Sequence, residues 1–168
     1  LPYLTALYVE HTGDAGILDE TAPYLEDVEI PAGAEDIYCD CTPSDELDTL
    51  RGHCLRAIRR ADTRGEHGLP LMGAGDWNDG MNRVGAQGRG ESVWLGMFMC
   101  EVLRCFAPLS GHADELMRRR DELMSALEAA GWDGQWYRRA YYDDGTPLGS
   151  ATGEECRIDL LSQAWAAL

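Results

Sequence analysis

Glu91-Ser92-Val93-Trp94-Leu95-Gly96-Met97-Phe98-Met99-Cys100-Glu101-Val102-Leu103-Arg104-Cys105-Phe106 is apolar nearly all round a helical projection. A helix without a polar face is typical of a protein core, because each of its sides must contact other apolar groups. Pro108-Leu109-Ser110-Gly111 follows, and we expect the helix to break there, since proline lacks the amide hydrogen that a helix needs. The sequence therefore predicts one buried helix at the centre of the fold.

Helical periodicity also dominates on both sides of this segment. Residues 15–43 show no sustained period and are expected to form a loop. Ser44 is the expected N-cap of the helix that follows this loop, with acidic residues in its first turn. The sequence thus predicts a mainly α fold whose other helices lie at residues 1–11, 44–65, 112–130 and 158–168.

A short β-hairpin is expected near residues 136–150. Trp136-Tyr137-Arg138-Arg139-Ala140-Tyr141-Tyr142 is rich in aromatic residues, and Asp143-Asp144-Gly145-Thr146 follows it directly. Asp-Gly between two such segments is a common hairpin turn.

Composition excludes several classes of protein. The 168 residues are 45% apolar, which allows a packed core within one domain. The formal charge of −16 argues against nucleic acid and anionic membrane surfaces as partners. No apolar run approaches the roughly 20 residues of a membrane span, and no signal peptide is visible. We expect no direct membrane contact from this segment.

The six cysteines do not have zinc-site spacing, so no metal is expected and a reducing, cytoplasmic setting is favoured. The chain begins at Leu1 and ends at Leu168 within apolar segments. We therefore expect residues 1–168 to be a single piece of something larger, truncated at both ends.

Residues 65–90 contain eight glycines, a density that no regular helix tolerates. Apolar residues such as Leu69, Met72 and Val84 are interspersed among them. A glycine-rich loop with apolar anchors is held in a fixed shape, and such loops often carry function.

The sharpest chemical feature within this loop is Gly73-Ala74-Gly75-Asp76-Trp77-Asn78-Asp79-Gly80-Met81-Asn82. Glycosyl transfer needs a carboxylic acid that protonates the departing oxygen. It also needs an aromatic face for the sugar ring and polar side chains for its hydroxyls. Burial beside Trp77 and repulsion from Asp76 would both raise the pKa of Asp79 towards the value that such an acid requires.

Other interpretations of this segment remain open. Asp76 could begin a calcium loop, but position 12 of that loop would be Gln87 instead of glutamate. The segment could also be a structural turn with Trp77 in the core. Outside it, Arg139 could line a sugar or phosphate site, whereas the four histidines form no constellation with a serine or cysteine nucleophile.

Residues 68–85, Gly68-Leu69-Pro70-Leu71-Met72 through Asp76-Trp77-Asn78-Asp79 to Gly85, resemble the catalytic segment of glycoside hydrolase family 94. Within this family of cellobiose and β-glucan phosphorylases, the likeness is greatest to the carboxy-terminal regions of cyclic β-1,2-glucan synthases. Further matching segments are Tyr8-Val9-Glu10-His11-Thr12-Gly13-Asp14, Gly90-Glu91-Ser92-Val93-Trp94-Leu95-Gly96, Trp136–Tyr141, Asp143-Asp144-Gly145, Ile158-Asp159 and Gln163-Ala164-Trp165.

The resemblance implies a partial (α/α)6 barrel with about half of its helices. It also implies inverting phosphorolysis of β-glucosidic bonds, with inorganic phosphate as co-substrate and no other cofactor. Asp79 then corresponds to the general acid and Trp77 to a sugar-binding position. Asn78, Asp76 and Arg139 are expected to help bind or shape the site.

The expected partners are a β-glucan oligosaccharide and phosphate, with a homodimer possible for a longer parent protein. Family residues that grip the sugar and bind phosphate fall before Leu1 and after Leu168, so the 168 residues alone are expected to be inactive. Two alternatives stay open: an inverting hydrolase, which needs a second carboxylate, and a non-catalytic carbohydrate-binding fragment.

Overall fold

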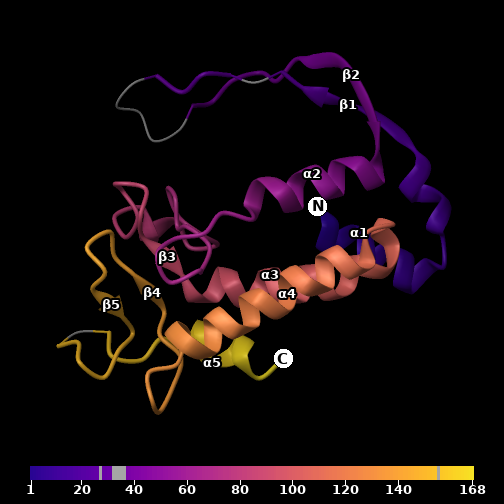
Figure 1. Cartoon of the computed structure of the whole chain (residues 1–168). Helices are drawn as coiled ribbons and strands as arrows, with labels where there is room; N and C mark the ends of the chain where they lie inside the picture. The colour runs from indigo at the N-terminus through magenta and orange to yellow at the C-terminus, as the bar shows by residue number, and fades with distance from the viewer. Residues whose placement is uncertain (27, 32–36, 155) are drawn as a thin grey trace. The chain divides into compact units, whose positions relative to one another are not determined.

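The computed structural model describes residues 1–26, 28–31, 37–154 and 156–168, with the side chain of Asp79 outside the description. The chain divides into two compact units, Leu1–Arg60 and Ala61–Leu168, called unit 1 and unit 2 below. Helices make up most of the regular structure, as the sequence predicts, and the strands are short (Figure 1).

Unit 1 combines two helices with a β-hairpin. Helix α1 (Pro2–Thr12) ends at Gly13, whose φ of 73° is the left-handed conformation that favours glycine. A 3-10 turn, η1 (Ala15–Asp19), leads into strand β1 (Thr21–Leu25). Strand β1 pairs antiparallel with β2 (Pro43–Thr49), and helix α2 (Leu50–Ala61) follows.

The prediction that Ser44 begins a helix is wrong, because residues 43–49 form strand β2. Its backbone pairs with β1, where Pro23 lies opposite Leu47, so tertiary pairing overrides the local capping pattern. Helix α2 begins six residues after Ser44. Thr49 takes the capping role, since its hydroxyl accepts a hydrogen bond from the amide of Gly52 at 3.1 Å.

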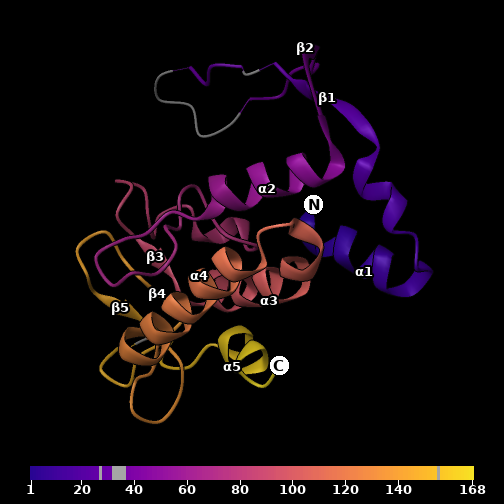
Figure 2. The same ribbon diagram turned by 45° about the vertical axis from the view of Figure 1, so that its right-hand side comes forward.

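Unit 2 is built around helix α3 (Val93–Ser110), which the sequence predicted to be buried. It packs along helix α4 (Ala113–Ala126), and the two lie side by side in both ribbon views (Figures 1 and 2). By length and composition α3 is also, among the described residues, the one helix that could span a membrane. Most of it is buried within the protein, however, as expected of a core helix.

The predicted break within residues 108–111 is confirmed: α3 continues past Pro108 but ends at Ser110, and Gly111 is its C-cap with a φ of 75°. Pro108 lies in the last turn, where one missing amide hydrogen disturbs little. The Ser110 hydroxyl donates to the carbonyl of Ala107 at 2.7 Å and so helps to close the helix end.

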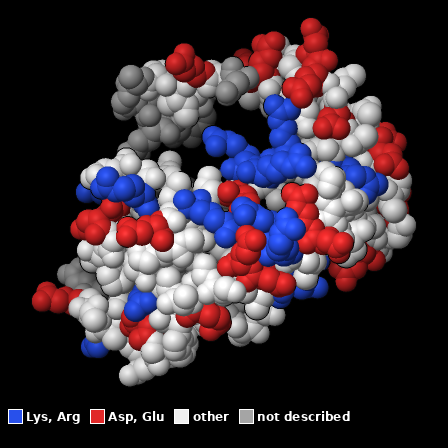
Figure 3. All heavy atoms as spheres, viewed as in Figure 1, with Lys and Arg blue, Asp and Glu red and all other residues white. Residues whose placement is uncertain are grey.

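Helix α4 continues into a π-helical turn, η3 (Leu127–Gly131), and its flank carries ion pairs. Arg119 pairs with Asp62 and also with Glu122, at 3.1 Å. Figure 3 shows acidic and basic side chains close together over this part of the molecule. The ion pairs of Arg119 thus link α4 to the segment that follows α2.

The hairpin predicted near residues 136–150 is confirmed as β4 (Ala140–Tyr141) and β5 (Pro147–Leu148). Strand β3 (Glu91–Ser92), directly before α3, adds to it and makes an antiparallel sheet in the order β3-β4-β5. The final helix, α5 (Leu160–Ala166), packs on α3. The small sheet therefore joins the start of the core helix to the hairpin.

Candidate functional site

The glycine-rich loop of residues 65–90 has a fixed shape, as its composition indicates. Leu69, Met72 and Val84 are almost completely buried and anchor it to unit 2. The amide of Met72 donates to the carbonyl of Gly90 at 2.7 Å, which closes the loop upon itself. Gly73 has a φ of 60°, so the turn into the Asp76 segment uses a conformation that other residues rarely adopt.

Asp143 fastens the far end of this loop to the hairpin. Its carboxylate accepts hydrogen bonds from three backbone amides, those of Gln87, Arg89 and Gly90, at 2.8–2.9 Å. Although desolvation acts against ionisation, these amides hold the pKa of Asp143 below its ordinary value. The turn residue that signals the hairpin in the sequence therefore also positions the glycine-rich loop.

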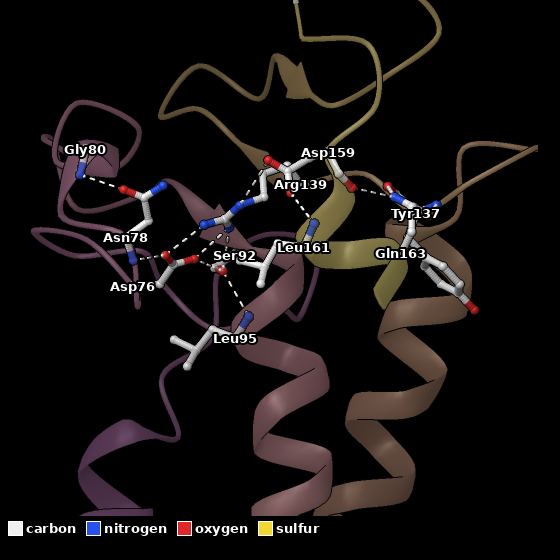
Figure 4. Close-up of polar contacts among 10 residues, drawn as sticks. All are labelled: Asp76, Asn78, Gly80, Ser92, Leu95, Tyr137, Arg139, Asp159, Leu161 and Gln163. Carbon is white, nitrogen blue, oxygen red and sulfur yellow. Dashed lines mark hydrogen bonds and ion pairs between the residues drawn. The ribbon is translucent and has the colours of Figure 1, made fainter. Parts of the chain in front are cut away.

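Asp76 lies at the centre of a buried polar network (Figure 4). Its two carboxylate oxygens accept hydrogen bonds from the two terminal nitrogens of Arg139, at 2.6 and 2.8 Å. The hydroxyl of Ser92 donates to Asp76 at 2.7 Å, and the amide of Asn78 donates at 3.1 Å. The side chains of Asp76 and Arg139 are 0% and 1% exposed, so solvent screens this pair very little.

Two opposing effects set the ionisation of Asp76. Burial alone would raise its pKa, because a low-dielectric environment disfavours the charged form. The hydrogen bonds from Arg139, Ser92 and Asn78 outweigh that effect and leave the pKa below its ordinary value. Asp76 is therefore a permanent anion at neutral pH.

The guanidinium of Arg139 joins segments that lie far apart in the chain. Besides Asp76 it contacts the Ser92 hydroxyl at 3.4 Å, and its Nε lies 3.9 Å from the carboxylate of Asp159 (Figure 4). Ser92 caps helix α3 by accepting from the amide of Leu95, and Asp159 caps α5 by accepting from that of Leu161. The buried guanidinium of Arg139 thus connects the starts of helices α3 and α5 to the Asp76 loop.

The next three residues of the loop differ in their surroundings. Trp77 is 69% exposed, and Asn78 is exposed as well. The Asn78 side chain accepts from the amide of Gly80 at 3.0 Å and caps a 3-10 turn, η2 (Asp79–Met81). The backbone of Asp79 begins this turn, whereas its side chain, the candidate general acid, lies outside the described residues.

These positions bear on the alternatives for the segment. A structural turn with Trp77 in the core is wrong, because the indole faces solvent. A calcium loop is not favoured, because both oxygens of Asp76 contact a guanidinium, and a cation in that place would repel Ca²⁺. The expected repulsion between Asp76 and Asp79 is also weakened, because Arg139 compensates the charge of Asp76.

A second buried carboxylate, that of Glu91, was not predicted from the sequence. It accepts from Nδ1 of His67 at 2.5 Å, and from the amides of His67 and Leu69 at 3.0–3.2 Å. The His67 ring stacks on Tyr141 with a centroid distance of 3.8 Å. His67 and Glu91 lie 24 residues apart in the sequence, so their spacing does not predict the contact between them.

The chain matches a known protein family. The model of the glycosyl hydrolase 94 superfamily catalytic domain matches residues 2–168. The chain belongs to the glycosyl hydrolase 94 superfamily. The resemblance inferred from the Asp-Trp-Asn-Asp segment is thereby confirmed.

The chain is similar to several curated members of this superfamily. It is 45% identical to the cyclic beta-(1,2)-glucan synthase NdvB of Rhizobium meliloti over the whole chain, which spans 6% of that protein. It is 37% identical to the solabiose phosphorylase of Paenibacillus borealis over 96% of the chain and 20% of that protein. It is 30% identical to the cellobionic acid phosphorylase of Neurospora crassa over the whole chain and 20% of that protein.

The chain therefore spans a fifth or less of these relatives. The part of the family that it matches is the catalytic domain of the glycosyl hydrolase 94 superfamily. Within the family segment, Asp76 and Arg139 contact each other, whereas Trp77 and Asn78 face outward.

Proposed function

We propose that the chain contributes the general acid and a sugar-binding face to an enzyme that cleaves β-glucosidic bonds of a β-1,2-glucan by inverting phosphorolysis. The observation that supports the proposal is the contrast between a buried residue and its exposed neighbours in the same loop. Asp76 is held inside by Arg139, while Trp77 is 69% exposed and the backbone that follows forms a 3-10 turn capped by Asn78. A loop that is anchored by a buried residue can hold reacting groups in place although those groups lie outside the core.

In the proposed reaction, the carboxylic acid of Asp79 gives its proton to the glycosidic oxygen as the bond from that oxygen to the anomeric carbon breaks. An oxygen of inorganic phosphate bonds to the same carbon from the opposite face. The products are a sugar 1-phosphate of inverted configuration and a shortened glucan. Because phosphate is the nucleophile, no second carboxylate has to activate water.

The side chains around Asp79 have separate roles in this proposal. The Trp77 indole packs on the apolar face of a sugar ring, and Asn78 orients its hydroxyls. Asp76 and Arg139 act as positioning residues, since each side chain is buried against the other. This replaces the expectation that Arg139 contacts the sugar directly.

The proposal also includes the wider setting expected from the resemblance. The 168 residues would form one part of an (α/α)6 barrel, and the packing of helix α3 against α4 supports a fold built from paired helices. The enzyme would be cytoplasmic and homodimeric, with β-glucan and phosphate as its small-molecule partners. The similarity to a solabiose phosphorylase and to a cellobionic acid phosphorylase supports phosphate as co-substrate.

The test measures phosphate-dependent release of glucose 1-phosphate from β-1,2-glucan by the intact protein. We expect Asp79→Asn to lower kcat at least 100-fold, because an amide has no proton to give to the leaving oxygen. Asp40→Asn, at an exposed position in unit 1, is the matched control and should retain full activity. Unchanged turnover in Asp79→Asn contradicts the assignment, and cleavage that needs no phosphate identifies a hydrolase instead.

A further inference from the structure

Unit 2 contains a hollow of about 420 Å³ beside the turn of the hairpin. Three segments form it: residues 64–67, residues 88–91 and the turn 142–145, together with Leu71. No residue of the 73–82 loop lines it. Its volume falls within the range of sites that bind small molecules.

His67 is held at the wall of this hollow in one orientation. Its Nδ1 is bound to Glu91 at 2.5 Å, and one face of its ring stacks on Tyr141. Because a carboxylate only accepts, Nδ1 carries the hydrogen of this bond, and Nε2 is the ring nitrogen left to contact a ligand. Within the described part of the chain, Nε2 has no hydrogen-bond partner, although the side chain is only 29% exposed.

The charges around the hollow decide which ligand it suits. Four acidic residues and two arginines line it, namely Glu66, Glu91, Asp143, Asp144, Arg64 and Arg89. This excess of negative charge opposes a phosphate ion. A neutral molecule with many hydroxyls suits such a mixture, because each hydroxyl can donate to a carboxylate or accept from a guanidinium.

An aromatic side chain that lines the hollow also favours a sugar as the ligand. Tyr142 lines the hollow and is 37% exposed, which leaves part of its ring open to a ligand. Sugar rings pack their apolar faces on such side chains, while their hydroxyls reach the polar groups around them. The hollow therefore combines a stacking surface, an oriented imidazole and both signs of charge.

We propose that this hollow is a second saccharide site, which takes a neutral glucosyl unit and holds one of its hydroxyls on Nε2 of His67. The choice of a β-glucan as ligand rests on the proposed function, whereas the location of the site does not. A second site away from the reacting bond would retain a long glucan between successive cleavages.

The test uses the intact protein with Asp79→Asn, which prevents turnover, and linear β-1,2-gluco-oligosaccharides as the probe in calorimetric titrations. His67→Asn is added to this background. The Asn amide nitrogen can replace Nδ1 at Glu91, whereas nothing replaces Nε2. We expect one class of sites to bind at least tenfold more weakly in His67→Asn, with the melting temperature changed by less than about 2 °C.

Trp77→Ala in the same background is the matched control, and it should weaken the other class of sites while leaving the His67-dependent one intact. Equal oligosaccharide affinity with and without Nε2 overturns the proposal, as does displacement of the saccharide from this site by inorganic phosphate. If His67→Asn lowers the melting temperature further, a crystal structure of the Asp79→Asn protein with oligosaccharide decides. Sugar within hydrogen-bond distance of Nε2 supports the site, and an empty hollow overturns it.

The two proposals can fail separately. Absence of glucose 1-phosphate release by the unsubstituted protein, with His67-dependent binding retained, rejects the phosphorylase function alone. Phosphorolysis with no His67-dependent binding rejects the second site alone.

Discussion

Two buried carboxylates in unit 2, Asp76 and Glu91, are held by different kinds of partner. Asp76 contacts the guanidinium of Arg139 through both oxygens, and that cation cannot lose its charge in a protein. Glu91 contacts an imidazole and two backbone amides, none of which carries a permanent charge. The Asp76 loop is thus fixed by a permanent ion pair, whereas the His67 segment is fixed by an imidazole and two backbone amides.

The largest effect should follow from breaking the ion pair. Arg139→Ala leaves Asp76 buried without a counter-charge, which we expect to lower the free energy of unfolding by about 3–5 kcal/mol. Chemical denaturation of the intact protein measures the change. Arg118→Ala, at an exposed position on α4, should change stability by less than about 0.5 kcal/mol. A loss from Arg139→Ala no larger than that of the control would show that the pair does not hold the loop.

A smaller effect, distinguished by its pH dependence, is expected for Asp76→Asn. The pKa of Asp76 is lower in the folded protein than its ordinary value of 3.8, so the charged form stabilises the fold above that pH. This contribution disappears as the pH falls through the folded-state pKa. The stability difference between the unsubstituted protein and Asp76→Asn should therefore be constant between pH 5 and 8, and shrink below about pH 4. A difference that grows on acidification would contradict the lowered pKa.

The smallest of the three effects should come from the Glu91 side of the comparison. His67→Ala removes the Nδ1 donor and the ring stacked on Tyr141, but leaves two amides on the carboxylate. We expect a loss of about 1–3 kcal/mol in the free energy of unfolding, and about 1 kcal/mol or less for His67→Asn, which retains a donor. Denaturation curves measured side by side give both values. Equal losses in the two variants would mean that the hydrogen bond to Glu91 contributes nothing.

The sequence predicted those parts of the fold that depend on local pattern. The buried helix after Ser92, the end of α1 at Gly13 and the hairpin around Gly145 each follow from apolar periodicity or from glycine at a left-handed position. The sequence wrongly predicted the start of a helix at strand β2, because its pairing with β1 depends on residues 18 to 28 positions away.

The residues of the candidate site could be predicted from the sequence, whereas the contacts between them could not. Asp76, Trp77 and Asn78 were found because they are consecutive, and Arg139 because it stands in an unusual aromatic stretch. The ion pair between Asp76 and Arg139 joins residues 63 positions apart, so nothing in the sequence spacing announced it. Ser92 could have been recognised as a helix cap before an apolar run, but not as a donor to Asp76. Contacts that the fold alone creates were the ones that the sequence did not reveal.

The distance along the chain between Asp76 and Arg139 has a consequence for biosynthesis. At about 5–20 residues per second, roughly 3–13 s pass between translation of the carboxylate and translation of the guanidinium 63 residues later. Until then the nascent loop lacks the counter-ion that locks it, and its aspartate must stay hydrated near the ribosome. The Asp76 segment thus gains its counter-ion only after the core helix α3 has been translated.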